Sequence, residues 1–242
     1  MKVVAIIQAR MGSTRLPGKV LMDLAGEPML VRVVNRVRRA ATLNEVVVAA
    51  TTQPADEAIA RLCDERKWPC FRGSEDDVLD RYYRAALERK ASVVVRVTSD
   101  CPLIEPTIVD LVVHEFMRRQ PEIAYASNVV PSRTFPRGLD TEVMQFAALE
   151  RAWKEDNNLA WREHVTPYLS EVEGRFSLHC VTNDEDYSSQ RWTVDTPEDF
   201  ELVRLIYEHF GHDRFSWREV LALLERHPEW LAINRHIVQK VL

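Results

Sequence analysis

A short segment near the start of the chain gathers three cationic side chains around two glycines. Arg10, Arg15 and Lys19 lie within ten residues of one another, directly after an apolar run. Gly12 and Gly18 would let backbone N–H groups approach an anion closely. Three cations beside such backbone could neutralise a polyphosphate, and this segment therefore predicts a phosphate-binding loop.

This segment differs from two common phosphate-binding motifs. Five residues separate Gly12 from Gly18 where a Walker A loop has four, and Val20 follows Lys19 where Ser or Thr would hold Mg²⁺. No G-x-G-x-x-G dinucleotide fingerprint occurs in the sequence. The alternative is a solvated basic surface turn, since basic side chains are ordinarily exposed. Loops carry function disproportionately, which favours the phosphate interpretation.

Two aspartates each follow a predicted strand. Asp100 comes after an apolar run and precedes Cys101-Pro102, and Asp195 ends the stretch Trp192-Thr193-Val194. If both strands reach one sheet edge, the two carboxylates can share a cation beside the basic segment. Mg²⁺ prefers one or two carboxylates with phosphate oxygens and water, so Asp100 and Asp195 are candidate magnesium ligands. The alternatives are a turn or cap at Asp100 and helix-start electrostatics at Asp195.

The elements around these residues follow a regular alternation in the first half. Short β-branched runs without polar alternation predict buried parallel strands over residues 3–7, 45–50 and 92–97. Amphipathic patterns predict helices over residues 28–39, 55–67, 76–90 and 107–119. This half is expected to be doubly wound, and ligands bind such sheets at the carboxyl ends of the strands.

The second half has a different texture. Strands are predicted over residues 123–127, 139–145, 176–182 and 191–195, with antiparallel additions and a lid-like subregion. Capping boxes at Thr196-Pro197-Glu198-Asp199 and Ser216-Trp217-Arg218-Glu219 predict two helix starts. The fold class is therefore α/β, with three layers and a mostly parallel sheet that carries a small antiparallel lid subregion.

Composition excludes several classes of protein. The 242 residues, 46% of them hydrophobic, can close one main core, and the net charge of −5 argues against a nucleic-acid or anionic-membrane binder. No apolar run approaches the roughly 20 residues of a membrane span, and no signal sequence is recognisable, so we expect a cytoplasmic protein. The four cysteines form no CxxC pair, which argues against a disulfide framework or a zinc site.

Three motifs together resemble a known family. They are the segment from Ala9-Arg10 to Pro17-Gly18-Lys19, the strand ending at Asp100-Cys101-Pro102-Leu103, and Val194-Asp195-Thr196-Pro197-Glu198-Asp199. The chain resembles sugar cytidylyltransferases of the CMP-Kdo and acylneuraminate synthetase type, and within them the spore-coat polysaccharide biosynthesis SpsF group. The Kdo enzymes carry Gln-Gly before the first aspartate, whereas Thr98-Ser99 stand here.

The resemblance implies a nucleotidyltransferase fold of the nucleotide-diphospho-sugar transferase type, and a CTP site. In the nucleotide site it implies contacts from Ala9, Arg10, Gly12, Ser13, Arg15 and Lys19. Asp100 and Asp195 match the family's magnesium-binding aspartates, and with Arg10 and Lys19 they form the expected catalytic set. Arg72 and Ser74 match a region near the nucleotide and could contact base or ribose, although Gly-Ser is also a common turn pair.

Acceptor contacts are expected from the second half of the chain. Residues 128–142 mix polar, aromatic and cationic groups around prolines and could form the acceptor pocket. The candidates are Arg133, Arg137, Glu142 and His164. Either arginine could pair bidentately with a sugar carboxylate, but an exposed arginine is as often a solubilising residue. His164 is a candidate base, but a single histidine is more often structural.

The leading hypothesis is a Mg²⁺-dependent transfer of CMP from CTP to an acidic sugar, with release of pyrophosphate, in polysaccharide or surface-glycan biosynthesis. Its alternatives are a nucleotide-sugar-dependent glycosyltransferase of related fold and a non-catalytic nucleotide-binding module. We expect one domain over residues 1–242, with a nucleotide-binding half at 1–120, an acceptor and lid region at 121–190, and a closing strand with helices at 191–242. The family resemblance further implies a homodimer.

Overall fold

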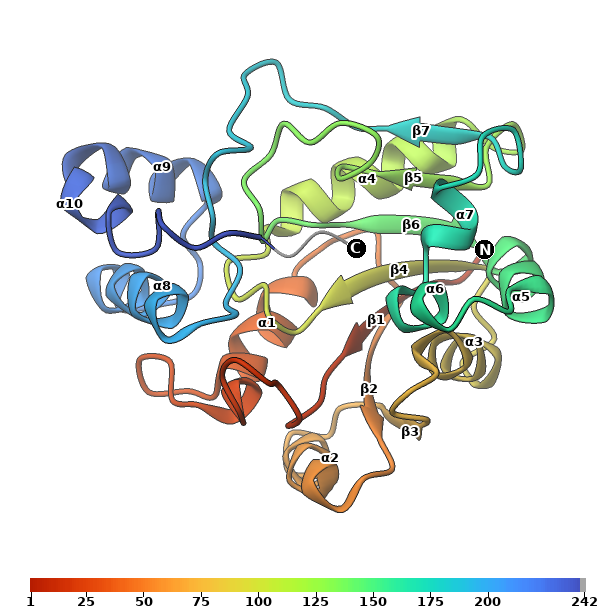
Figure 1. The fold of residues 1–242 in the computed structure, drawn as a ribbon, viewed down its shortest axis with the longest axis horizontal. Coiled ribbons are helices and arrows are strands. Elements are labelled where there is room, and N and C mark those ends of the chain that lie inside the picture. Colours follow the sequence, from red (N-terminus) through yellow and green to blue (C-terminus); the bar gives the residue numbers. More distant parts are fainter. Residues whose placement is uncertain (240–242) are drawn as a thin grey trace.

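One seven-stranded sheet runs through the protein (Figure 1), whose computed structural model describes residues 1–239. The strands are β1 (Val3–Gln8), β2 (Glu45–Thr51), β3 (Cys70–Gly73), β4 (Val93–Thr98), β5 (Tyr125–Ser127), β6 (Glu142–Gln145) and β7 (Leu178–Cys180). Their order is β3-β2-β1-β4-β6-β5-β7. The first four are parallel to one another, β6 is antiparallel to both its neighbours, and β7 is parallel to β5. The predicted α/β class with a mostly parallel sheet is confirmed.

The chain changes direction across the sheet between β1 and β4. It passes from β1 to β2 and β3 on one side, then returns to β4 on the other side of β1. Gln8, which ends β1, lies in register with Thr98, which ends β4. In open α/β sheets a crevice forms outside the carboxyl ends of the strands at such a switch point, and ligands bind there. The segments after β1 and β4 therefore meet where a ligand is expected.

Helices cover both faces of the sheet and complete three layers (Figure 1). One face packs against α1 (Met29–Val37), α2 (Glu57–Glu65), α4 (Pro106–Arg118), α8 (Pro197–Phe210) and α9 (Trp217–Arg226). The other packs against α3 (Val78–Glu88), α5 (Phe146–Glu155) and α7 (Pro167–Ser170). The shorter helices are η1 (Lys19–Leu21), η2 (Pro54–Asp56), α6 (Leu159–His164) and α10 (Pro228–Leu231). None of the helices within residues 1–239 has the length and apolar character that crossing a membrane requires.

The two faces account for the unbroken apolar strands. In β1, Val4 and Ile6 belong to the core under α3, whereas Ala5 and Ile7 belong to the core under α1 and α4. Successive side chains of a strand point to opposite faces, so a strand buried on both faces must be apolar at every position. Gln8 continues the series of Val4 and Ile6, which places its side chain on the α3 face.

Both predicted capping boxes are present. Thr196 Oγ1 accepts a hydrogen bond from Asp199 N (3.3 Å), and the Asp199 carboxylate accepts one from Thr196 N (3.1 Å). Ser216 and Glu219 make the same reciprocal pair at the start of α9. Each box satisfies backbone donors that the first turn of a helix leaves without partners. In α8 it also fixes where the segment carrying Asp195 turns into the helix.

The predicted strand over residues 191–195 is not a strand. Its only ladder contact within residues 1–239 is an isolated bridge between Arg191 and Arg137. The backbone bonds go elsewhere: Val194 N donates to Asp100 O (2.8 Å), and Asp195 N donates to the Asp199 carboxylate (3.0 Å). The backbone of this run thus finds its hydrogen-bond partners in a loop and a helix cap rather than in a neighbouring strand. The three preceding strands are also shorter than the predicted ranges 123–127, 139–145 and 176–182.

Candidate active site

A cavity of about 450 Å³ lies at the carboxyl ends of β1 and β4, at the switch point of the sheet. Its walls come from the segment after β1, the segment after β4, and helices α3 and α6, together with Asp195. Eight of the predicted site residues line it, namely Ala9, Arg10, Ser13, Arg15, Lys19, Asp100, His164 and Asp195. Residues almost a hundred positions apart are thereby brought into one polar cavity.

The basic segment is a tight loop held by its own backbone. Met11 O accepts a hydrogen bond from Gly18 N (3.0 Å), and Met11 N donates to Asp56 Oδ1 (2.7 Å). Gly18 has φ +73°, in the left-handed region, which glycine adopts without the steric cost of a Cβ. The loop then enters η1, whose first residue is Lys19. This closure turns the loop's cations toward the cavity instead of along an extended chain.

Several backbone donors of the loop are left without partners. Within residues 1–239, the N–H groups of Gly12, Thr14 and Arg15 meet no acceptor of the chain. Successive unpaired N–H groups in a turn form a concavity that binds anions. Backbone and side chains of this loop therefore offer the same kind of interaction to a phosphate.

Lys19 joins the two predicted magnesium ligands. Its side chain is buried, and Nζ donates to Val194 O (2.6 Å) and to Asp195 Oδ1 (3.1 Å). The same Nζ lies 3.6 Å from Asp100 Oδ2. The ammonium group of Lys19 thus lies within 4 Å of both carboxylates, so Asp100 and Asp195 lie at one place in the fold.

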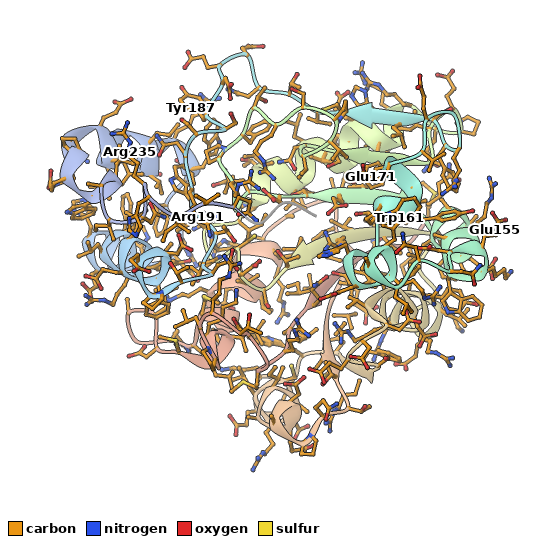
Figure 2. The ribbon with its side chains drawn as sticks, viewed as in Figure 1. Glu155, Trp161, Glu171, Tyr187, Arg191 and Arg235 are labelled. Carbon is orange, nitrogen blue, oxygen red and sulfur yellow. The ribbon has the colours of Figure 1, made fainter. Side chains whose placement is uncertain are left out.

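Among the described carboxylates that line the cavity, Asp195 has the largest number of cationic partners. Besides Lys19, it pairs with Arg15 Nη2 (3.0 Å) and with Arg191 Nη2 (3.1 Å). Burial by itself would raise the pKa of Asp195, but the surrounding cations outweigh burial and hold that pKa below its usual value. Figure 2 labels Arg191 on the extended segment beside α8, where it also pairs with Asp199 (2.8 Å). The carboxylate is therefore ionised and held in a fixed position.

Asp100 is held less tightly. Thr98 Oγ1 donates to Asp100 Oδ1 (2.5 Å), and the Cys101 thiol lies 3.5 Å from the same oxygen. Its other oxygen faces Lys19 at 3.6 Å, and about a quarter of the side chain is exposed. Burial raises the pKa of the Cys101 thiol, so Cys101 stays protonated beside the carboxylate.

The two carboxylates fit a divalent cation that arrives with a nucleotide. The ammonium group of Lys19 lies near both carboxylates, so the space between these carboxylates suits a cation. Within residues 1–239 no group of three or more His, Cys, Asp or Glu side chains could hold a metal by itself. Mg²⁺ binds through one or two carboxylates plus phosphate oxygens and water, which matches this donor set.

Comparison with known proteins identifies the family. A cytidylyltransferase family model matches residues 4–222 of the chain. The chain is a cytidylyltransferase. It is 30% identical over 237 residues to the spore coat polysaccharide biosynthesis protein SpsF of Bacillus subtilis, covering 94% of this chain and 95% of SpsF. As a member of this family, it is a CTP-dependent nucleotidyltransferase.

Two solved structures resemble this cytidylyltransferase. A cytidylyltransferase from Leptospira borgpetersenii superposes over all of both chains with a TM-score of 0.92 and 33% identity. A CMP:2-keto-3-deoxy-manno-octonic acid synthetase in complex with CTP superposes with a TM-score of 0.65 over 86% of this chain and 99% of the synthetase. At 21% sequence identity, this superposition shows that the two proteins share a fold. The predicted family and the nucleotidyltransferase fold are confirmed.

Two residues assigned to base or ribose contacts are engaged elsewhere in the cytidylyltransferase. The Arg72 guanidinium donates to Thr51 O (3.0 Å) and pairs with Glu57 Oε2 (2.5 Å). Ser74 Oγ accepts a hydrogen bond from Asp77 N (3.0 Å), next to the start of α3. Neither lies on the cavity wall, because Arg72 is on the face of β3 that packs toward α2. Gly12 also lies outside the wall, and a Cβ there would meet Glu75 Oε1 at 3.3 Å.

The acceptor candidates divide into partnered and unpartnered side chains. Arg133 pairs with both oxygens of Asp140, and Glu142 pairs with Arg96 and accepts a hydrogen bond from Tyr125 (2.7 Å). These two side chains hold the sheet and its neighbouring loop together and do not line the cavity.

Arg137 also lies outside the cavity wall, but it differs from Arg133 in its partners. Within residues 1–239 its side chain has no ion pair or hydrogen bond, and it is half-buried with Asp140 and Asp195 among its charged neighbours. Burial chiefly lowers the pKa of Arg137. The backbone beside it is closely packed, since a Cβ at Gly138 would lie 2.7 Å from Trp192 C.

Helix α6 contributes the last wall. His164 ends α6 and lines the cavity next to Glu163, while Trp161 lies one turn earlier on the same helix (Figure 2). Burial chiefly lowers the pKa of His164, so the imidazole is neutral near pH 7. Arg10 lies between two carboxylates at long range, 3.7 Å from Glu75 and 3.9 Å from Glu163. Its guanidinium is free to exchange these contacts for a phosphate.

The sequence argument missed several residues of the cavity wall, among them Gln8, Val78, Arg81 and Thr98. Arg81 could have been found, because it lies three residues after Val78 and four before Ala85, on the apolar stripe of its helix. A cation at a core position of an amphipathic helix is rare and needs a hydrogen-bonding or charged partner. Gln8 carried a similar signal as the polar end of an apolar strand.

Proposed function

We propose that this cytidylyltransferase transfers CMP from CTP to a hydroxyl group of an acidic sugar and releases pyrophosphate. The observation that carries the proposal is the cavity itself, in which a cationic loop with free N–H groups faces two aspartates joined by Lys19. Such an arrangement suits a triphosphate and its counter-cation. A transfer of this kind needs positioning and charge neutralisation, and no nucleophilic side chain.

The basic loop would hold the phosphates of CTP. Arg10 and Arg15 offer guanidinium groups that bind phosphate oxygens bidentately, and the backbone N–H groups of Thr14 and Arg15 add uncharged donors. Arg15 would then exchange its ion pair with Asp195 for the phosphates. Lys19 would neutralise the charge that develops on the pyrophosphate as it leaves.

Asp100 and Asp195 would hold the magnesium ion. When bound, Mg²⁺ would supply charge neutralisation at the α-phosphate and would lower the pKa of the attacking hydroxyl. Arg191 and Asp199 keep Asp195 in place, and Thr98 orients Asp100. The oxygen of the hydroxyl forms the new bond to phosphorus while the bond to the pyrophosphate oxygen breaks.

An acidic acceptor is supported by one side chain in particular. Arg137 is a half-buried cation without an ion pair among residues 1–239, and it has Asp195 among its charged neighbours. A carboxylate on the sugar would provide the missing partner and would place a neighbouring hydroxyl toward the α-phosphate. His164, which lines the cavity at the end of α6 and is neutral near pH 7, would accept a hydrogen bond from a hydroxyl group of the sugar. We propose that residues 121–190 form this acceptor side.

The relatives support the same substrates. The synthetase of related fold was solved with CTP and acts on 2-keto-3-deoxy-manno-octonic acid, an acidic sugar. SpsF is named for polysaccharide biosynthesis, which supports a role in making a surface glycan. A homodimer and a cytoplasmic location remain predictions of the sequence.

The decisive experiment measures pyrophosphate release. Purified protein is incubated with Mg²⁺, each of the four nucleoside triphosphates, and a panel of acidic and neutral sugars. We expect release with CTP and an acidic sugar, and a CMP-sugar of matching mass. Release of nucleoside monophosphate or diphosphate from a finished sugar nucleotide would instead indicate a glycosyltransferase. Binding of CTP without turnover on any sugar would contradict the proposal and favour a non-catalytic module.

A further inference from the structure

A buried arginine on the cavity wall lacks the partners that burial requires. Arg81, on α3, is 1% exposed, yet within the described residues 1–239 only its Nη1 has an acceptor, Ser74 O at 2.7 Å. Its Nε is buried with no hydrogen-bond partner, and among residues 1–239 no carboxylate lies within 4 Å of the guanidinium. Burying a cation without an ion pair is costly, so a side chain in this state is typical of a site completed by a ligand.

The surrounding structure makes room for this side chain. Gly73, at the end of β3, lies under Arg81, and a Cβ there would come within 2.9 Å of Phe71 and 3.2 Å of Arg81 Cγ. A side chain at position 73 would displace the Phe71 ring and press against the stem of the arginine. Burial lowers the pKa of Arg81, and the charged groups that act on it are Arg10, Asp56 and Glu75. The fold thus accommodates a guanidinium that it does not neutralise by direct contact.

A second unpartnered polar group lines the same cavity on the same face of the sheet. Gln8 ends β1, and its Oε1 is buried without a hydrogen-bond partner. The oxygen and nitrogen of an amide side chain can exchange places by a flip, so Gln8 can offer either an acceptor or a donor. Arg81 has no such freedom, because a guanidinium only donates. The apolar side chains of Ala9 and Val78 lie on the wall beside these two groups.

From these two groups we propose that Arg81 and Gln8 read the edge of the nucleotide base and select cytosine against uracil. This inference rests on the proposed function, since it takes CTP as the nucleotide. Cytosine presents two adjacent acceptors, O2 and N3, and the N4 amino donor. The Nε–H and Nη2–H of Arg81 would donate to O2 and N3, and Gln8 Oε1 would accept from N4–H.

Uracil fails at one position of this pattern. Its N3 carries a hydrogen, which would oppose a guanidinium that cannot accept. Gln8 could flip to donate to O4 of uracil, so the amide by itself does not discriminate between the bases. Arg81 is therefore the specificity-determining residue, and Gln8 strengthens the binding of either pyrimidine.

The test compares nucleotide affinities in the absence of a sugar, by calorimetry with Mg²⁺. We expect the unmodified protein to bind CTP at least about tenfold more tightly than UTP. Arg81→Met should weaken CTP binding by about 10- to 100-fold and bring the CTP and UTP constants together, because it removes two hydrogen bonds from a charged donor. Arg84→Met, on the exposed side of the same helix, is the matched control and should change neither constant.

Further variants keep the test decisive. Arg81→Lys retains the charge but not the forked donors, and it should also lose the preference for CTP, which covers the case in which Arg81→Met fails to fold. Gln8→Leu should weaken CTP and UTP alike. A CTP/UTP ratio that survives both Arg81 substitutions, or unmodified protein that does not discriminate between CTP and UTP, would overturn the inference. If the ratio collapses as expected but no sugar yields pyrophosphate, the proposed transfer fails while the base-reading role stands.

Discussion

Two buried arginines on opposite faces of the sheet are treated in opposite ways. Arg36, on α1, is fully buried and donates to Ile104 O (2.6 Å), Asp213 O (2.7 Å) and Phe215 O (3.0 Å), with Glu105 Oε2 at 3.3 Å. Arg81, on α3, is about as deeply buried but has one acceptor among residues 1–239. The chain therefore supplies hydrogen-bond acceptors for the guanidinium of Arg36. The guanidinium of Arg81, on the cavity wall, keeps unpaired donors within residues 1–239.

This difference separates structural from ligand-binding cations better than burial alone. Arg36 ties α1 to the segments that precede α4 and α9, so its hydrogen bonds are made on folding. The unsatisfied donors of Arg81 remain for a molecule that binds later. Arg133 and Arg137 repeat the contrast near the acceptor side, because Asp140 pairs with the first and no carboxylate pairs with the second within residues 1–239. Substituting an arginine that has partners within the chain should therefore affect stability. Substituting an arginine with unpaired donors should affect binding or turnover.

The largest effect is expected for Asp100→Asn, on the cavity wall. Removing one of the two carboxylates should lower kcat by about a thousandfold, since a metal ion contributes several kcal/mol of transition-state stabilisation. Pyrophosphate release measures the loss, and circular dichroism should report an unchanged fold. Asp64→Asn, on the exposed surface of α2, serves as the control. An Asp100→Asn variant with near-normal turnover would refute the metal assignment.

The two buried arginines themselves provide the next comparison. Arg36→Met should lower the free energy of unfolding by about 3–5 kcal/mol, because it leaves Glu105 buried without its cation. Arg81→Met should change this free energy by no more than about 1 kcal/mol, since removal of an unpaired buried charge offsets the loss of one hydrogen bond. Urea denaturation of both variants measures the difference. Equal losses, or a larger loss at Arg81, would show that the distinction drawn from their partners is wrong.

A smaller effect is expected on the acceptor side. Arg137→Ala should raise the KM for an acidic sugar about tenfold with little change in the KM for CTP, because one charge-assisted pairing is lost. Arg133→Ala is the matched variant, and it should reduce stability through the loss of its pair with Asp140. Kinetics with the sugar and CTP varied in turn distinguish these results. An unchanged sugar KM in Arg137→Ala would assign the sugar carboxylate to another group.

The smallest effect concerns the pH response of His164. Its pKa lies below the ordinary histidine value, chiefly because burial disfavours the charged ring. The folded state therefore binds fewer protons than the unfolded chain, and the contribution of His164 to stability declines as the pH falls through the ordinary value toward the lowered one. Proton NMR should find an imidazole signal that titrates below the ordinary histidine value and disappears in His164→Gln, whereas the signal of His179, whose pKa burial also lowers, should remain. A signal that titrates at or above the ordinary value would contradict this reading of its surroundings.

Much of the fold was accessible from local patterns. The buried strands of the first half and the helices at Thr196 and Ser216 follow from continuous apolar runs and from capping boxes, which act over a few residues. The run at 191–195 was predicted as a strand and is not one. A strand requires a neighbour, and the backbone of this run is bonded instead to Asp100 and Asp199.

The candidate site shows where local information ends. The loop with Arg10 and Lys19 and the two aspartates could be recognised, because cations beside glycines and carboxylates after apolar runs are local features. Arg72 has the same residue type as Arg81 and lies only nine positions earlier, yet it pairs with Glu57 on the far face of β3.

The sequence by itself determined the family, the class of the fold and the strands and helices of the first half, since each of these depends on patterns within a few turns or strands. The tertiary structure decided which polar side chains have partners. Whether Arg36, Arg81, Arg133 or Arg137 meets an acceptor depends on segments up to about 180 residues away, as the bond from Arg36 to Phe215 illustrates. Satisfaction of a buried charge is a property of the folded surroundings, and no residue type or spacing encodes it locally.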